Sequence, residues 1–201
     1  MEWLLIVLVI LAVAAGVVVY RQRQRQQEAQ KRAAAPGPRQ DPFAEVHGNE
    51  RALFELKVGD LIRYHNADWW IRGTLRLDER GYTWAEHLIS DFKDQHWLSV
   101  EEDEGVTIGL YDRVPPGDVG GNAGDDTVTY GDGVFKLVEQ GEATFVAEGT
   151  TGTAPQGSAR YADYESSDGR LLSFEQFGQQ WEVSVGTHVL PAALDIFPVS
   201  D

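Results

Sequence analysis

The residues best suited to chemistry lie close together in one segment of about twenty residues. Trp84, Glu86 and His87 come first, and Trp97 and Glu101 follow. Two carboxylates held side by side could raise the pKa of one of them and carry out acid–base chemistry. Together with a histidine they could instead hold a divalent cation. We therefore take these five residues as a candidate ligand or partner surface.

A structural role competes with this chemical one. In a strand, Trp84 and Glu86 share one face while His87 takes the other. If the two segments form a hairpin, Glu86 comes near Ser99 or Glu101. Alternating Trp and Glu on adjacent strands is also typical of a packed face whose buried carboxylates accept hydrogen bonds.

Motifs of known enzyme classes are missing from the sequence. It has no H-E-x-x-H pattern, no cysteine pair, no G-x-S-x-G elbow and no glycine-rich phosphate loop. We therefore assign no catalytic residue, no metal ligand and no cofactor, and predict that the protein is not an enzyme. An enzyme built on Glu86 and Glu101 is the least favoured alternative.

The elements that must position these residues are short strands. Residues 60–64, 69–73, 105–111 and 181–185 are rich in β-branched and aromatic side chains, and turns containing Gly, Asn or Asp separate such runs. This pattern predicts a mainly β domain, either a sandwich or a barrel-like fold.

An internal repeat sharpens this prediction. Four segments of the first part resemble four of the second, in the same order: 54–60 with 135–142, 84–87 with 161–164, 97–101 with 171–175, and 106–110 with 181–185. We predict two similar β repeats, residues 50–114 and 133–201. A Gly- and Asp-rich surface loop, residues 115–132, is expected to be mobile and to join them.

The N-terminal segment predicts a membrane anchor within residues 1–21. Trp3 to Tyr20 contains no charged residue and would form about 27 Å of helix, close to the thickness of a hydrocarbon core. Trp3 and Tyr20 suit the two interfaces. A cleaved signal peptide is disfavoured because no basic residue precedes the apolar run and no clear cleavage site follows it.

Basic residues just after the anchor predict its direction. Arg21, Arg23 and Arg25 follow the apolar run at once. The positive-inside rule places them in the cytoplasm, so the N-terminus would lie outside and the β domain inside the cell. Residues 22–49 are expected to form a polar helical extension and a linker.

The charge distribution restricts the partners. The net charge is −15, yet residues 1–40 carry six basic and only two acidic side chains, so the acid excess lies in the β domain. Such a domain repels phosphate backbones, and nucleic-acid binding is therefore not expected. The sequence has no cysteine, which suits a reducing compartment.

Several motifs resemble one bacterial family. Residues 56–60 (LKVGD), 70–73 (WIRG), 84–88 (WAEHL) and 97–101 (WLSVE) are similar to the domain of unknown function catalogued as DUF4178. The resemblance covers most of residues 52–198. It implies a β-rich domain of bacterial proteins, often near membrane-spanning segments and encoded beside membrane-stress and polyamine-synthesis genes. The family has no established activity, so the resemblance supplies no catalytic residue.

Two functions follow from these observations. The first is a single-pass, membrane-anchored, non-enzymatic interaction module that contacts lipid through its anchor and a protein partner at the cytoplasmic face. The alternative is a sensor domain that binds a small ligand or a cation, such as a polyamine or a metal ion. The acid excess and the aromatic side chains suit an ammonium group.

Overall fold

The computed structural model of this protein describes residues 52–103 and 105–199. Residues 52–54 are helical, and strands make up most of the remainder. The strands are β1 (Leu61–Tyr64), β2 (Ala67–Glu79), β3 (Tyr82–Ser90), β4 (Gln95–Asp103), β5 (Gly105–Val114), β6 (Val119–Gly120), β7 (Thr127–Tyr130), β8 (Gly133–Gly149), β9 (Gln156–Ser166), β10 (Arg170–Gln176), β11 (Glu182–His188) and β12 (Asp195–Phe197). Two short 3-10 helices are η1 (Pro116–Asp118) and η2 (Pro191–Ala193).

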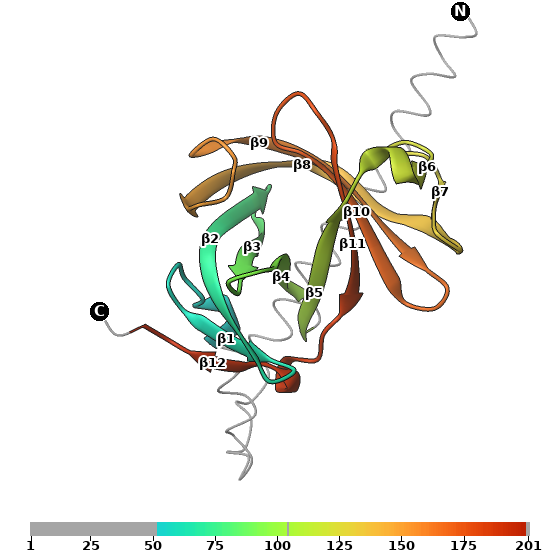
Figure 1. Cartoon of the computed structure of the whole chain (residues 1–201). Coiled ribbons are helices and arrows are strands. Elements are labelled where there is room, and N and C mark those ends of the chain that lie inside the picture. Colours follow the sequence, from blue (N-terminus) through green and yellow to red (C-terminus); the bar gives the residue numbers. More distant parts are fainter. Residues whose placement is uncertain (1–51, 104, 200–201) are drawn as a thin grey trace, which may run out of the picture. The chain divides into compact units, whose positions relative to one another are not determined.

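Eight of these strands form a closed antiparallel barrel (Figure 1). Strands β2 to β5 make one run of neighbours and β8 to β11 make another. The β5–β11 pairing joins the two runs on one side, and the β2–β8 pairing closes the barrel on the other. The domain is therefore mainly β, as predicted, and of the two expected architectures the barrel is correct. A barrel of eight strands has an interior wide enough for side chains or one small ligand.

Apolar side chains cover the outside of the first run of strands. Ile89, Leu98, Val100 and Ile108 point outward from β3, β4 and β5 and are almost completely buried. Segments from both ends of the described chain pack on them: Leu53 and Leu56, Ile62 of β1, and Val189 and Leu194 around η2. These segments shield from water a face that the barrel alone would expose.

A second apolar layer covers the outside of β9, β10 and β11. Tyr164, Leu172 and Phe174 point outward there, and Val119 and Val128 pack on them. These two valines belong to the segment 115–132, which we expected to be a mobile surface loop. The segment instead contains η1, β6 and β7. Its Gly and Asp residues form the turns, while the two valines are buried, which fixes the segment on the barrel.

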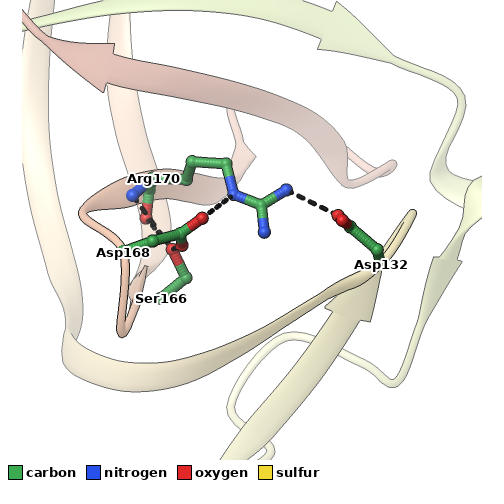
Figure 2. A network of polar contacts seen from close by, with 4 residues as sticks. All are labelled: Asp132, Ser166, Asp168 and Arg170. Atoms are coloured by element: carbon green, nitrogen blue, oxygen red, sulfur yellow. Dashed lines mark hydrogen bonds and ion pairs between the residues drawn. The ribbon is translucent and has the colours of Figure 1, made fainter.

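A polar network fastens one end of this second half (Figure 2). Arg170 Nη1 lies 2.9 Å from Asp132 Oδ1, and its Nε lies 2.9 Å from Asp168 Oδ2. Ser166 Oγ accepts a hydrogen bond from the Arg170 backbone N–H at 2.9 Å. The turn between β9 and β10 is thereby tied to the turn between β7 and β8.

A buried aspartate fastens the first half. Asp60 is 2% exposed. Its Oδ2 accepts the backbone N–H of Lys57 at 3.0 Å, and its Oδ1 accepts that of Val199 at 2.9 Å. The short carboxylate thus joins the start of β1 to the chain after β12, so the structure explains why the motif at 56–60 ends in Asp.

The predicted anchor, residues 1–21 with Trp3, Tyr20, Arg21, Arg23 and Arg25, and the linker, residues 22–49, lie outside the described residues. Between residues 52 and 199, leaving out residue 104, no helix combines the length and the apolar character needed to cross a bilayer.

Candidate functional site

Strands β3 and β4 direct a polar set of side chains into the barrel. Glu86 lies directly opposite Ser99, and Trp84 lies opposite Glu101. Since opposite residues of an antiparallel pair point to the same side, all four face the interior, while their neighbours in sequence face the apolar outer layer. The prediction that Glu86 comes near Ser99 or Glu101 is therefore correct.

Strands β9 and β10 repeat this arrangement. Asp163 lies opposite Ser173, and Tyr161 lies opposite Glu175. These residues occupy the positions that the sequence comparison matched with Glu86, Ser99, Trp84 and Glu101. The barrel thus carries two sets of the same kind, one in each half, and both face the interior.

The two sets line one cavity of about 90 Å³. Its thirteen lining residues comprise five carboxylic acids, five aromatic residues and three serines, as follows: Glu86, Glu101, Glu139, Asp163 and Glu175; Tyr82, Trp84, Trp97, Tyr111 and Tyr161; Ser99, Ser173 and Ser184. None of the thirteen is basic. Arg113 lies at the margin of this lining, opposite Ser184 and with its guanidinium carbon 5.8 Å from the centre of the Trp97 ring. It is paired with Glu182, and its charge lowers the pKa of Glu86.

Glu86 and Glu175 meet inside the barrel and form a hydrogen bond with each other. Two carboxyl groups can do so only if one of them carries a proton. Burial raises the pKa of both groups, and that of Glu175 is raised further by the charge of Glu86 and by the shared hydrogen bond. Trp84 Nε1 donates to Glu86 Oε1 at 3.1 Å, which favours the ionised form of Glu86. We therefore place the proton on Glu175.

Asp163 has a different environment. Burial raises its pKa to about 7, even though a hydrogen bond with Ser173 favours its charged form. The charges of Glu86, Glu139 and Glu101 raise this pKa as well. Asp163 is therefore a carboxyl group that changes its charge near neutral pH.

Tyrosines hold the carboxylates at the edge of the cavity. Tyr161 Oη donates to Glu79 Oε2 at 2.6 Å and lies 3.3 Å from Glu139 Oε1. Tyr82 Oη donates to Glu101. Burial and the hydrogen bond with Glu79 raise the pKa of Tyr161, so this hydroxyl keeps its proton and remains a donor.

The predicted site residues divide into two groups. Trp84, Glu86, Trp97 and Glu101 lie on one cavity wall. His87 does not, because it faces the outer layer, is fully buried and lies 3.0 Å from Thr74 Oγ1 through its Nδ1. Burial lowers the pKa of His87 to about 3, so it is neutral. The candidate surface is therefore corrected by leaving His87 out.

A metal site does not form from these residues. His96, the other histidine of the segment, packs edge-on against Trp69 with ring centroids 4.7 Å apart and is paired with Asp112. In the described part of the chain, no group of three or more histidine or acidic side chains is arranged to hold a metal ion.

Sequence reasoning missed half of the cavity. Asp163, Glu175 and Tyr161 were matched to Glu86, Glu101 and Trp84 by the repeat, but they were not recognised as partners in one site. The repeat was the signal that could have found them. Tyr111 carried no such signal, because it follows the last matched segment, and the residue at the corresponding place after 181–185 is Gly186.

The cavity residues fall within a domain that a family model recognises. The model described as "Domain of unknown function (DUF4178)" matches residues 57–191. The chain belongs to the DUF4178 family. The resemblance seen in the four motifs is therefore confirmed, and all thirteen cavity residues lie inside the DUF4178 match.

Relatives of this DUF4178 protein occur in mycobacteria. The uncharacterized protein Mb2628 of Mycobacterium bovis is 34% identical over 176 residues, which cover 84% of each chain. The uncharacterized proteins MT2673 and Rv2597 of Mycobacterium tuberculosis match to the same extent. No solved structure shows a significant match.

Proposed function

We propose that this DUF4178 barrel binds a small organic cation in its interior. The observation that carries the proposal is the cavity lining, where five carboxylic acids and five aromatic rings occur without a basic side chain. Ammonium groups bind to carboxylates by charge-assisted hydrogen bonds and to aromatic rings through their faces.

The energetics support the same proposal. Buried carboxylates without a cationic partner reduce stability, and proteins normally pair or protonate them. The proton on Glu175 neutralises one group, and Asp163 is half-neutral near pH 7. Arg113 offsets part of the charge of Glu86, and an ammonium group entering the cavity would add positive charge beside the other carboxylates. An organic cation fits better than a metal ion because the aromatic walls offer contacts to carbon atoms.

Calorimetric titration of the full chain in detergent micelles tests this function. We would use n-butylammonium, 1,4-diaminobutane and tetramethylammonium as probes at pH 8. We expect one or more to bind, and D163N to weaken that binding ten- to hundredfold, because one charge-assisted hydrogen bond contributes about 1.5–3 kcal/mol. D132N, in the turn network of Figure 2, is the matched control and should bind like the wild type. Failure of all three probes at millimolar concentration would disprove the proposal.

The protein-interaction module remains a second candidate because of one surface. Trp70 of β2 and Phe197 of β12 are exposed, and both lie opposite Leu61 of β1, so the three side chains form a row across three strands. Affinity capture with wild-type and W70S/F197S protein from solubilised membranes tests this role. A partner that the double variant captures equally well would count against this surface.

The membrane location is a proposal that rests on the sequence of residues 1–40. We propose one span with the barrel in the cytoplasm. A phosphatase that is active only outside the cytoplasm, fused to the C-terminus, should be inactive in this arrangement. An active fusion would show that the barrel lies outside the cytoplasm.

We also propose that the barrel arose from two similar repeats, residues 50–114 and 133–201. The matched interior residues and the equal pairing of β3–β4 and β9–β10 support this interpretation.

A further inference from the structure

Tyr111 lies inside the barrel on a seat made by two glycines. A Cβ atom built on Gly109 would stand 2.4 Å from Tyr111 Cε2, and one built on Gly186 would stand 2.6 Å from Cδ1. Contacts this short do not occur between real atoms, so the ring occupies the space that side chains at these two positions would need. At Gly109 the three nearest atoms all belong to Tyr111, whereas at Gly186 the backbone oxygen of Leu110, 2.7 Å away, also leaves no room for a side chain.

The seat determines which way the ring faces. Gly109 lies opposite Ser99, a cavity residue, and Gly186 lies opposite Tyr111 itself, so the missing side chains would point into the barrel. The ring thus covers the inner wall where β5 and β11 meet. The ring also lines the cavity, so part of it is exposed to the interior.

The surroundings of Tyr111 are acidic. Burial raises the pKa of its hydroxyl well above the usual value, and the charges of four carboxyl groups raise it further: Asp163, Glu175, Glu86 and Glu101. The phenol is therefore neutral, and the ring face keeps the negative potential that attracts cations.

We infer that Tyr111 is the platform on which the ligand of this cavity rests, with a cationic group held over the inward face of the ring. The inference rests on the proposed binding of an organic cation and adds the residue that positions it. It also predicts the stoichiometry. The position matched to Tyr111 in the second half is Gly186, so the barrel has room for one ring at this seam and binds one cation on it.

Four variants of the full chain test the platform, again in micelles at pH 8 with the tightest of the three probes. Y111F keeps the ring and should bind within about threefold of the wild type. Y111L removes the ring and should weaken binding about tenfold. G109A keeps every polar group but forces the ring off its seat, and it should weaken binding at least as much as Y111L.

The double variant G109A/Y111L supplies the decisive comparison. The three atoms nearest to a methyl group added at Gly109 all belong to the Tyr111 side chain, so we expect its effect to vanish once the ring is gone. We expect the double variant to bind like Y111L, at one probe per chain. If Y111L does not fold, as judged by near-UV circular dichroism, G109A compared with Y111F supplies the test.

The outcomes separate the two proposals. Wild-type protein that binds no probe overturns both the function and the platform. If the wild type binds a probe and Y111L, or its substitute G109A, binds it equally well, the platform role of Tyr111 is disproved and the proposed function stands. Two probes per chain would also contradict it.

Discussion

The two halves of the barrel carry the same plan with different residues. Inside, Glu86 of the first half corresponds to Asp163 of the second, and Glu101 corresponds to Glu175. The longer Glu86 forms a hydrogen bond with Glu175, whereas the shorter Asp163 forms one with Ser173 on the neighbouring strand. The matched acids thus differ: Glu86 shares a hydrogen bond with a second carboxyl group, whereas Asp163 bonds to a serine and has a pKa of about 7.

The seam between the halves shows the same principle. The first half places Gly109 and Tyr111 where the second places Ser184 and Gly186. The seam therefore contains one large ring, that of Tyr111, and not one ring from each half. The comparison teaches that a repeated backbone can produce an asymmetric site when only a few interior residues differ.

The outer layers differ in composition as well. The first half buries mainly aliphatic side chains, whereas the second buries Tyr164 and Phe174, whose ring centroids lie 5.8 Å apart. The matched positions are His87 for Tyr164 and Val100 for Phe174. These pairs allow each half to be perturbed separately.

The largest effect is expected from the outer layer of the second half. F174A should lower the free energy of unfolding by about 3–5 kcal/mol, because it removes a buried ring and leaves a cavity. The matched V100A should lower it by about 2 kcal/mol. Urea unfolding measures both, and equal losses would show that the aromatic layer contributes no more than the aliphatic one.

The carboxyl group of Asp163 should make the fold less stable as the pH rises from acidic to neutral values. Its pKa is about 7 in the folded protein and 3.8 as the reference. The folded state therefore holds the proton more tightly, and stability is lost as the pH rises from about 4 through 7. D163N should be more stable than the wild type at pH 8 by roughly 4 kcal/mol, with little difference at pH 4. Parallel denaturation curves that differ equally at both pH values would contradict this account.

His87 should have the opposite effect in the other half. Its pKa is about 3 in the folded protein and 6.5 as the reference. The unfolded state therefore takes up the proton first, and stability is lost as the pH falls from 6.5 toward 3. The loss should reach about 2 kcal/mol at pH 5. H87Q cannot titrate, so its unfolding free energy should fall less steeply over this range than that of the wild type. Matching slopes would refute this role of His87.

The smallest effect concerns the matched serines. S173A removes the hydrogen bond that favours the charged form of Asp163 and should raise the pKa of Asp163 further. S99A, at the matched position opposite Glu86, should leave that pKa unchanged. Carboxyl-carbon NMR titration measures the pKa of Asp163 in both variants. An equal change of this pKa in both would show that the serine of each half affects Asp163 to the same extent.

Local pattern explains how much of the site could be predicted. Alternation along residues 84–87 and 97–101 placed Trp84, Glu86, Trp97 and Glu101 on one face, because successive side chains of a strand point to opposite sides. The same alternation should have removed His87 from the candidate surface. The prediction of a mobile surface loop at 115–132 relied on its many Gly and Asp residues. Its packing depends instead on two buried valines, Val119 and Val128.

The sequence by itself determined the family, the mainly β class, the acidic character and the order of the two matched sets of residues. These properties depend on residue type and local spacing. Only the tertiary structure decided that the strands close into a barrel, that Glu86 meets Glu175, and that Tyr111 rests on Gly109 and Gly186. Those contacts join residues far apart in the chain, and the pairing of β5 with β11 and of β2 with β8 determines them. The carboxyl groups found first, beside Trp84 and Trp97, therefore form only one wall of the site.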